Sequence, residues 1–519
     1  MSDDPAAQQA GRPHGRRGPR TVRGFGPALL LTVLGALVPG SAFLATGRRR
    51  LGAAVVVVFL VLLGGVAYFA TTGFREAVQL AVSSTALRWV IGGVVALAVA
   101  WLLVVLVGYA LLLPRRTRPW QHVVGAVVVL ALCAGVAVPA VWAVRIANAQ
   151  ADLLDSVFAD RDSATVTDPG DDADPFGDRD EVNFLLLGGD GGAGREGVRT
   201  DTVIVANVQT DTGETTLFSL PRNLQELPFP EDSPLGEVYP DGFDAGSESE
   251  SLLNAVYRNG PAWYPDVLGP TDDPGADFLK LGVGEALGLE IDYFVLVNLD
   301  GFSRLVDALG GIDVNVNYYV PIGGEPTLGI LPDDYIAPGP DQHMDGTRAL
   351  DYARGRFGLS DYQRMDRQRC VISAIVDAAD PVTLLTRFQR LAATTQDIVA
   401  TDVPQSLLDD VVDLAFEVKD TEIRSVVFDD TVIDPAYPDY DRIRALVQQA
   451  LGNAPASTPA ESTSAQGAAA PSATPPSGTA TSAPAADADP AAEVSDACAY
   501  DPVEAQAALA EGEPPTRNG

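Results

Sequence analysis

The stretch VNFLLLGGD, residues 182–190, decides the fold. It is a short apolar run closed by Gly-Gly-Asp, which is the pattern of a buried strand that ends in a flexible loop. Two β-rich runs follow at 202–208 and 215–220, and the Thr-Asp-Thr-Gly-Glu turn between them predicts a β-hairpin. Because hairpin strands run back antiparallel, both outer ends of the hairpin should lie close to the loop that begins at Asp190.

Downstream of the hairpin, helical and strand-like stretches alternate. The acidic, Pro- and Gly-rich segment 224–250 is interpreted as an exposed insertion. Helices are expected at 277–287, 301–308, 345–354 and 361–379, and strands at 293–298 and 313–320. The alternation predicts an α/β or α+β domain over 182–452, with a mixed central sheet flanked by helices.

Three apolar stretches that precede this domain predict transmembrane helices. Residues 51–72, 89–113 and 123–144 contain no charge, and each has about the 20 residues that a bilayer core requires. A fourth stretch, 25–46, is interrupted by Pro39-Gly40. It is either a re-entrant segment or a further crossing.

The basic residues indicate how these helices are oriented. Arginines cluster within 1–24, at 48–50 and at 115–118, and the positive-inside rule places all three clusters in the cytoplasm. Three crossings satisfy this rule and put the domain outside, whereas four would put it inside. We therefore expect a multi-pass cell-membrane protein with a basic cytoplasmic tail, a membrane region at 25–147 and an extracytoplasmic catalytic domain.

Two polar segments flank the predicted domain. Residues 148–181 are rich in Asp, Ser, Thr, Gly and Pro and predict a solvated linker, and 453–519 are dominated by Ala, Pro, Ser, Thr and Gly and predict a disordered tail. Cys370 and Cys498 could pair in an oxidising compartment, but a buried Cys370 and a free Cys498 are the expectation.

Arginine and aspartate recur together, although the formal net charge of the chain is -34. They do so in four short blocks, LLLGGD (185–190), RTDTV (199–203), SLPRN (219–223) and YARGRFGLSDYQRMDRQ (352–368). Guanidinium groups bind phosphate oxygens bidentately, and carboxylates such as Asp190 and Asp201 are ligands for Mg²⁺ or Mn²⁺. The blocks therefore predict a site for pyrophosphate and a divalent metal. The alternative is that each Asp caps a turn and each Arg makes a surface ion pair. The arginines in or beside the motifs are Arg199, Arg222, Arg354, Arg356, Arg364, Arg367 and Arg369.

Other chemistries receive little support. The glycine-rich loop 188–197 lacks the Gly-Lys-Ser/Thr ending of a nucleotide-binding P-loop. His343 has no evident Ser or Cys partner for nucleophilic hydrolysis. The short cytoplasmic tail shows no helix-turn-helix pattern, so no nucleic-acid partner is expected.

Six blocks in a defined order resemble the LytR-CpsA-Psr family of cell-wall glycopolymer ligases. They are NFLLLGGD (183–190), RTDTVIVANV (199–208), LFSLPRN (217–223), LLNAVYRNG (252–260), IDYFVLVNLDGFSRLVDALGGIDVNV (291–316) and HMDGTRALDYARGRFGLSDYQRMDRQR (343–369). Two residues depart from the family pattern. Asn223 stands where the family usually has Asp, and Leu252 stands where it often has a basic residue.

The resemblance implies transfer of a glycopolymer from a polyprenyl-pyrophosphate carrier to peptidoglycan at the membrane. Asp190 and Asp201 would bind the metal, and Asp201 would help to deprotonate the attacking hydroxyl. The apolar elements between the motifs would form a tunnel for the lipid tail. The pyrophosphate would be held by Arg199, Arg222, Arg354, Arg356, Arg364 and Gln368, of which the first four would act in catalysis with Asp201.

Two other functions remain open at this point. The first is a pyrophosphatase that acts on the same lipid carrier with water as the acceptor. The second is a non-catalytic, membrane-bound regulator of envelope synthesis. The polymer itself, whether teichoic acid, arabinogalactan or capsule, is not specified by the sequence.

Overall fold

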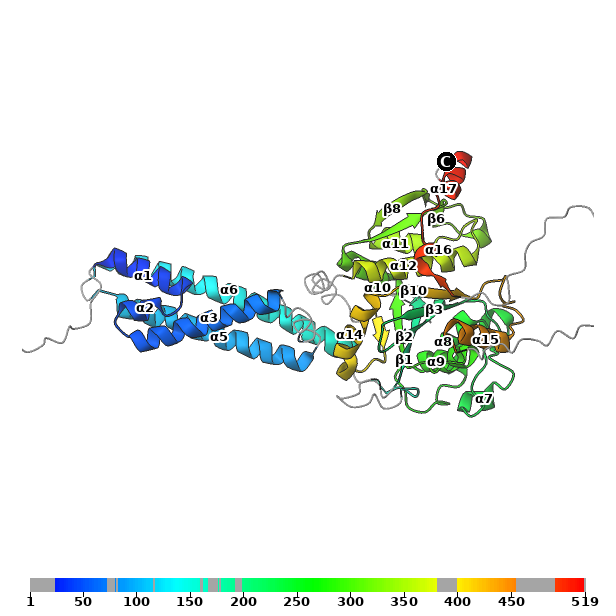
Figure 1. Cartoon of the computed structure of the whole chain (residues 1–519), viewed down its shortest axis with the longest axis horizontal. Helices are drawn as coiled ribbons and strands as arrows, with labels where there is room; N and C mark the ends of the chain where they lie inside the picture. The colour runs from blue at the N-terminus through cyan, green and yellow to red at the C-terminus, as the bar shows by residue number, and fades with distance from the viewer. Residues whose placement is uncertain are drawn as a thin grey trace, which may run out of the picture. The chain divides into compact units, whose positions relative to one another are not determined.

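A computed structural model describes residues 24–71, 80, 83–114, 117–158, 162–166, 176, 179–191, 198–379, 399–453 and 491–517. The chain divides into two compact units, Met1–Ala151 and Asp152–Gly519. Figure 1 shows the first as helical and the second as a sheet with helices on both faces.

The first unit contains three helices that are long and apolar enough to cross a membrane: Arg49–Phe69, Ser84–Leu112 and Pro119–Asp152. They lie within α3 (Arg49–Thr71), α5 (Ser84–Leu112) and α6 (Pro119–Val157). Each overlaps one of the three predicted transmembrane stretches. The chain is therefore expected to be anchored in a membrane.

The first apolar stretch folds differently. It forms two short helices, α1 (Phe25–Leu37) and α2 (Ser41–Ala45), separated at Pro39-Gly40. Proline has no N–H for a helical bond, and Gly40 takes a positive φ of 101°. A helix of 13 residues is shorter than a membrane crossing requires.

The second unit is built on a seven-stranded mixed sheet with the order β11-β10-β3-β2-β1-β4-β9. β1, β2 and β3 are antiparallel neighbours, whereas β4 pairs parallel with β1 and β10 pairs parallel with β3. The predicted hairpin and the predicted mixed sheet are thus confirmed. The strands are β1 (Glu181–Gly189), β2 (Thr200–Gln209), β3 (Thr215–Leu220), β4 (Tyr293–Asn298), β9 (Val399–Thr401), β10 (Ile423–Val427) and β11 (Ala492–Glu493).

Every predicted helix of the domain is present, and a capping side chain marks the start of each. The Asp273 side chain accepts from the N–H of Ala276, which starts one helix three residues before the predicted position. A capping box of Ser360 and Gln363 starts another. The helices are α8 (Leu253–Trp263), α9 (Pro274–Leu287), α10 (Leu299–Leu309), α11 (Gly346–Arg354), α12 (Asp361–Ala378), α14 (Leu408–Lys419) and α15 (Tyr440–Ala450).

The prediction of one strand at 313–320 was wrong. The stretch divides into β5 (Ile312–Val316) and β6 (Val320–Ile322). They pair with different partners, β8 (Gly339–Met344) and β7 (Asp334–Ile336), to give two small two-stranded sheets. The chain must change direction between them, and apolar patterning alone does not reveal such a bend.

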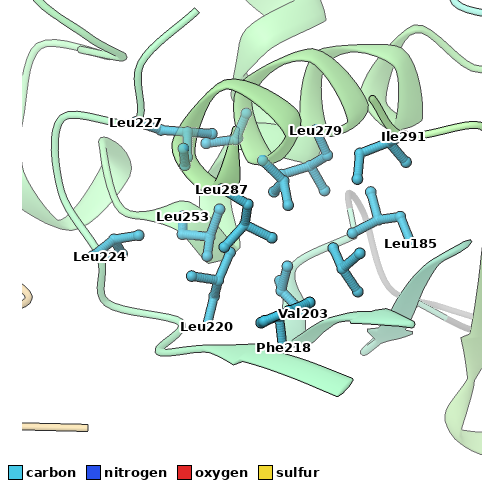
Figure 2. Packing of buried hydrophobic residues seen from close by; sticks show 14 of the residues in the cluster. Leu185, Val203, Phe218, Leu220, Leu224, Leu227, Leu253, Leu279, Leu287 and Ile291 are labelled. Carbon is cyan, nitrogen blue, oxygen red and sulfur yellow. The ribbon is translucent and has the colours of Figure 1, made fainter. Parts of the chain in front are cut away.

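One face of the large sheet packs on α8 and α9. Figure 2 shows Leu185, Val203 and Phe218 from the strands opposed to Leu279 and Leu287 of α9. The opposite face is covered by α10 and α12 (Figure 1). The two faces follow from alternation along each strand, because successive side chains point to opposite sides.

The segment 224–250 belongs to this core, so its interpretation as an exposed insertion was wrong. Leu224, Leu227 and Leu235 are fully buried and Phe243 is nearly so. Leu227 packs on α9 so closely that a Cβ added at Gly282 would lie 2.5 Å from it. The buried residues are spaced irregularly, so neither helical nor strand periodicity marks them.

A buried ion pair joins α9 to the residue that follows β9. Lys280 Nζ lies 2.6 Å from Asp402 Oδ2 and also donates to the carbonyl of Asp292 at 2.8 Å, and both charged side chains are almost wholly buried. Burial raises the pKa of Asp402, and the charge of Lys280 opposes that shift. The ammonium group of Lys280 and the carboxylate of Asp402 therefore each need the other as a partner of opposite charge while they are buried in the core.

Lys280→Met should lower the free energy of unfolding by about 3–5 kcal/mol, because it leaves Asp402 as an unpaired buried carboxylate. Urea unfolding of the full chain, followed by circular dichroism, measures the loss. The control is Lys419→Met, at the chain's only other lysine, whose Nζ bonds to backbone carbonyls at the surface. Equal losses in the two variants would contradict the prediction.

A disulfide joins Cys370 of α12 to Cys498. The expectation of a free Cys498 was therefore wrong. The predicted disorder of the tail was also wrong for residues 491–517. Residues 454–490 lie outside the described residues. β11 pairs with β10, and the Cys498 carbonyl accepts from Asn315 Nδ2 at 3.0 Å. The disulfide, the strand pairing and this hydrogen bond hold the tail in an ordered conformation. The composition of the tail does not reveal these contacts. The tail includes α16 (Val494–Ala497) and α17 (Pro502–Glu511).

Cys498→Ser should lower the free energy of unfolding by about 2–4 kcal/mol, because the bond closes a long loop between cysteines at a sequence separation of 128. The urea midpoint of the full chain under oxidising conditions reports the change. Cys133→Ser, at a free cysteine in α6, is the matched control. An unchanged midpoint for Cys498→Ser would show that the bond does not support the domain.

Part of the predicted linker at 148–181 is structured. Helix α6 continues to Val157, and the hydroxyls of Ser163 and Thr165 donate to Asp277 Oδ1 at 2.9 and 2.7 Å. The remainder of that linker lies largely outside the described residues.

Candidate active site

The site begins where β1 ends and β2 starts. The backbone N–H of Asp190 donates to the Arg199 carbonyl at 3.1 Å, and Asp190 Oδ1 accepts from the Arg199 N–H at 2.8 Å. Gly188 lets the strands approach, since a Cβ there would lie 2.8 Å from the Thr202 side chain. The centre of the glycine-rich loop, 192–197, lies outside the described residues.

Asp201 sits inside a network of donors. Its Oδ1 accepts from Arg222 Nη1 at 2.9 Å and from Asn254 Nδ2 at 3.0 Å. Burial alone would raise the pKa of Asp201, but the hydrogen bond from Asn254 and the charge of Arg222 outweigh it and lower the pKa. The carboxylate is therefore held ionised.

A second carboxylate, Asp361, bridges two arginines. Its Oδ1 lies 3.3 Å from Arg222 Nε and its Oδ2 lies 2.9 Å from Arg364 Nη2. Burial lowers the pKa of Arg364 although Asp361 opposes the shift, and among the described residues its Nε has no hydrogen-bond partner. An incoming anion would satisfy this buried cation.

These groups surround one end of a cavity of about 540 Å³. Six of the predicted site residues line it: Asp190, Asp201, Arg354, Arg356, Arg364 and Gln368. Arg354 and Arg356 enter from the end of α11 and the residues just after it, whereas Arg364 and Gln368 enter from α12. The sequence blocks, far apart in the chain, thus converge on one cavity.

The other end of the cavity is apolar. Val295 and Val297 lie on β4, inside the sheet, yet are only half-buried because they face this space. The face of α12 that carries Arg364 and Gln368 continues as an apolar stripe. The apolar lining residues include Leu186, Ile204, Val295, Val297, Phe302, Leu305, Val371, Ile372, Ile375 and Val376.

Two predicted residues do not line the cavity. Arg222 borders it through its bond to Asp201. Arg199 is directed elsewhere, since its Nη2 lies 2.7 Å from Glu250 Oε1. Glu250 also pairs with Arg258, so these residues form a separate ion-pair cluster beside the start of β2.

The remaining motif arginines serve the fold. Arg367 is buried and donates to the carbonyls of Tyr352 and Gly355. These carbonyls flank Arg354, so Arg367 fixes the turn that presents Arg354 and Arg356. Arg369 is likewise buried, and it pairs with Asp366.

Sequence reasoning assigned no role to Asn254 or Asp361. Both lie inside quoted blocks, LLNAVYRNG and SDYQRMDRQ, so their positions were visible. Their contacts with Asp201, Arg222 and Arg364 depend on packing between α8, β2 and α12, which a linear motif does not show.

The carboxylates fit a metal that binds together with phosphate. Among the described residues, no group of three or more His, Cys, Asp or Glu side chains could hold a metal ion by itself. Mg²⁺ commonly takes one or two carboxylates and completes its shell with water and phosphate oxygens. Asp190 and Asp201, which line the same cavity as Arg364, supply such a donor set.

A larger cavity of about 1120 Å³ lies elsewhere in the domain. Its lining is polar and includes Glu181, Glu290, Asp292 and Arg424, but none of the predicted site residues. The smaller cavity is therefore the better candidate, because it combines the motif residues with an apolar wall.

Comparison with known proteins places these features in a family context. The sequence model of the LytR_cpsA_psr family matches residues 143–438. The polyisoprenyl-teichoic acid–peptidoglycan teichoic acid transferase TagU of Enterococcus faecalis is 29% identical over 232 residues, 43% of this chain and 62% of that protein. The probable cell wall biosynthesis protein LcpB of Corynebacterium glutamicum is 31% identical over 213 residues, 40% of this chain and 41% of that protein.

The chain also matches parts of solved structures. Bacillus subtilis TagV is 23% identical, with a TM-score of 0.35 over 53% of this chain and 98% of that chain. TagT bound to LIIa-WTA is 20% identical, with a TM-score of 0.34 over 53% of this chain and 91% of that chain. The chain spans less than two thirds of the length of the two curated relatives above.

Proposed function

The chain belongs to the LytR-CpsA-Psr family, and from this premise we propose that it transfers a glycopolymer from a polyprenyl-pyrophosphate carrier to peptidoglycan. Distant relatives in Enterococcus faecalis and Bacillus subtilis are named as teichoic acid–peptidoglycan transferases. Their names support the reaction class, and the residues of this chain support the chemistry.

The observation that carries the proposal is the two-sided cavity. Its apolar walls come from β1, β2, β4, α10 and α12, and its other end holds arginines and aspartates. A polyprenyl pyrophosphate has a matching division, with a hydrocarbon tail joined to a doubly charged group. Water-soluble nucleotides would leave the apolar walls exposed to solvent, at a cost in free energy.

In the proposed reaction, the acceptor hydroxyl of peptidoglycan attacks the phosphorus nearest the glycopolymer. A new oxygen–phosphorus bond forms, the bond to the bridging oxygen breaks, and polyprenyl phosphate leaves. Arg354, Arg356 and Arg364 would hold the phosphate oxygens on which charge develops. Mg²⁺ or Mn²⁺, held by Asp190 and Asp201, would supply further positive charge.

Asp201 would accept the proton of the attacking hydroxyl. Its lowered pKa keeps it ionised but makes it a weak base, so orientation of the hydroxyl is its larger contribution. Arg222 and Asn254 fix its Oδ1. Arg199 would act from its position beside Asp190 only after leaving Glu250.

The experiment that tests this proposal uses the purified full chain. Native mass spectrometry should find retained polyprenyl phosphate, and incubation with a lipid-linked glycopolymer should release polyprenyl phosphate only when peptidoglycan is present. Equal release without peptidoglycan would indicate the pyrophosphatase instead. Absence of both lipid and turnover would favour the non-catalytic regulator.

We also propose that the domain lies outside the cytoplasmic membrane. The support is the placement of the arginine clusters at 1–24, 48–50 and 115–118 relative to three crossings. A reporter fused after residue 150 should be active only on the outer side. Cytoplasmic activity of that reporter would contradict the orientation.

A further inference from the structure

The loop between β6 and β7 carries an exposed apolar tip. From Pro326 to Pro332 the sequence PTLGILP contains no charge. Leu328 is 74% exposed, and Ile330 and Leu331 are 38% and 36% exposed. Three neighbouring aliphatic side chains at the surface of so acidic a chain are unusual for a face that meets only water.

This tip is a folded turn. Glu325 and Ile330 exchange two backbone hydrogen bonds, of 2.8 and 3.0 Å, and the N–H of Gly329 donates to the Pro326 carbonyl. The N–H of Thr327 donates to Glu325 Oε1, and the prolines have no N–H. The backbone N–H groups of Glu325, Thr327, Gly329 and Ile330 are therefore satisfied within the loop, which lowers the cost of contact with a lipid surface.

The base of the same loop borders the cavity. Gly323, Gly324 and Glu325 line it together with Arg356. On its far side the loop is held by Arg517, which donates its N–H to the Pro332 carbonyl at 2.8 Å and lies 3.3 Å from Asp333. The apolar tip is thus fixed next to the cavity that would receive a lipid.

We propose that Leu328, Ile330 and Leu331 insert into the surface of the membrane that anchors the chain and hold the neighbouring cavity close to the lipid. The inference rests on the proposed function. A lipid surface is the occupant favoured by the structure, because the base of this apolar loop lines a cavity that also has apolar walls. The three membrane-length helices of the same chain keep that surface at high effective concentration.

The charges beside the tip set the depth of insertion. Glu325, Asp333 and Asp334 flank it and would remain among the head groups, since a carboxylate in hydrocarbon is strongly disfavoured. The three aliphatic side chains reach no deeper than the boundary between head groups and acyl chains.

A spin label measures this insertion directly. The full chain carrying Cys133→Ser and Leu328→Cys is reconstituted into vesicles of phosphatidylethanolamine and phosphatidylglycerol. The control label is at Tyr437→Cys, a position 81% exposed in the segment between β10 and α15. The label at 328 should collide readily with oxygen and poorly with a water-soluble nickel chelate, whereas the label at 437 should show the reverse.

Two outcomes would overturn the proposal. A label at 328 that behaves like the label at 437 would place the tip in water. A label shielded from both reagents would place it against protein, such as a second copy of the chain.

Activity supplies an independent test. A variant that carries the three changes Leu328→Ser, Ile330→Ser and Leu331→Ser should transfer about tenfold more slowly from a vesicle-embedded long-chain donor. With a short-chain soluble donor, this variant should react at the rate of the unsubstituted chain. An equal change for the two donors would contradict membrane docking. If the unsubstituted chain transfers from neither donor, the proposed function fails, and the spin-label result still decides the docking.

Discussion

Arg354→Ala and Arg356→Ala should each lower kcat/KM for glycopolymer transfer by about 10²–10³-fold, the effect of removing one fixed donor to developing charge. Both side chains line the cavity, and neither is buried in the core. The fold should therefore survive the change. A transfer assay with a lipid-linked donor and peptidoglycan, together with the urea midpoint, measures both effects.

The matched control is Arg348→Ala, an exposed arginine on the same helix α11 that does not line the cavity. It should transfer normally. Arg354→Lys and Arg356→Lys should fall between, because lysine keeps the charge but loses the planar fork. Undiminished transfer by Arg354→Ala and Arg356→Ala would remove these arginines from the mechanism.

Asp190→Ala should lower activity and the response to Mg²⁺ together, by about 100-fold in the transfer rate. Asp190 also has a structural contact, since its Oδ1 accepts the Arg199 N–H. Asp190→Asn separates the two roles, because the amide oxygen keeps that bond but lacks the charge. We expect Asp190→Asn to lose Mg²⁺ dependence nearly as fully as Asp190→Ala.

The measurement is the transfer rate as a function of Mg²⁺ concentration. Asp211→Ala, at an exposed carboxylate in the turn after β2, is the control and should leave the titration unchanged. A fully active and metal-independent Asp190→Ala would exclude this carboxylate from metal binding.

The central strands were predictable because local pattern and burial agree. β4 begins and ends at the predicted residues, 293–298, and the hairpin has its predicted turn. In contrast, Leu224 and Leu227 are buried by contacts with residues distant in sequence. Such burial has no local signal, which is why the segment 224–250 was misinterpreted.

The sequence predicted which residues belong to the candidate site better than it predicted how their side chains are arranged. The motifs identified Arg354, Arg356 and Arg364, which the structure brings to one cavity. They could not show that Arg199 pairs with Glu250, because that contact depends on how the chain after β3 returns to the sheet. The Cys370–Cys498 bond was missed for a similar reason, since the sequence does not show that the tail packs on α12.

The bridge from Asp201 through Arg222 and Asp361 to Arg364 also bears on turnover. Before a donor arrives, these cations already have anionic partners within the protein. A diphosphate that binds must then replace these carboxylates as the partner of the arginines. The free energy of binding is therefore only the difference between the contacts that are gained and the contacts that are lost. A monophosphate product has fewer charged oxygens to compete with the returning carboxylates. The same bridge that weakens the capture of the donor would hasten the departure of the spent carrier.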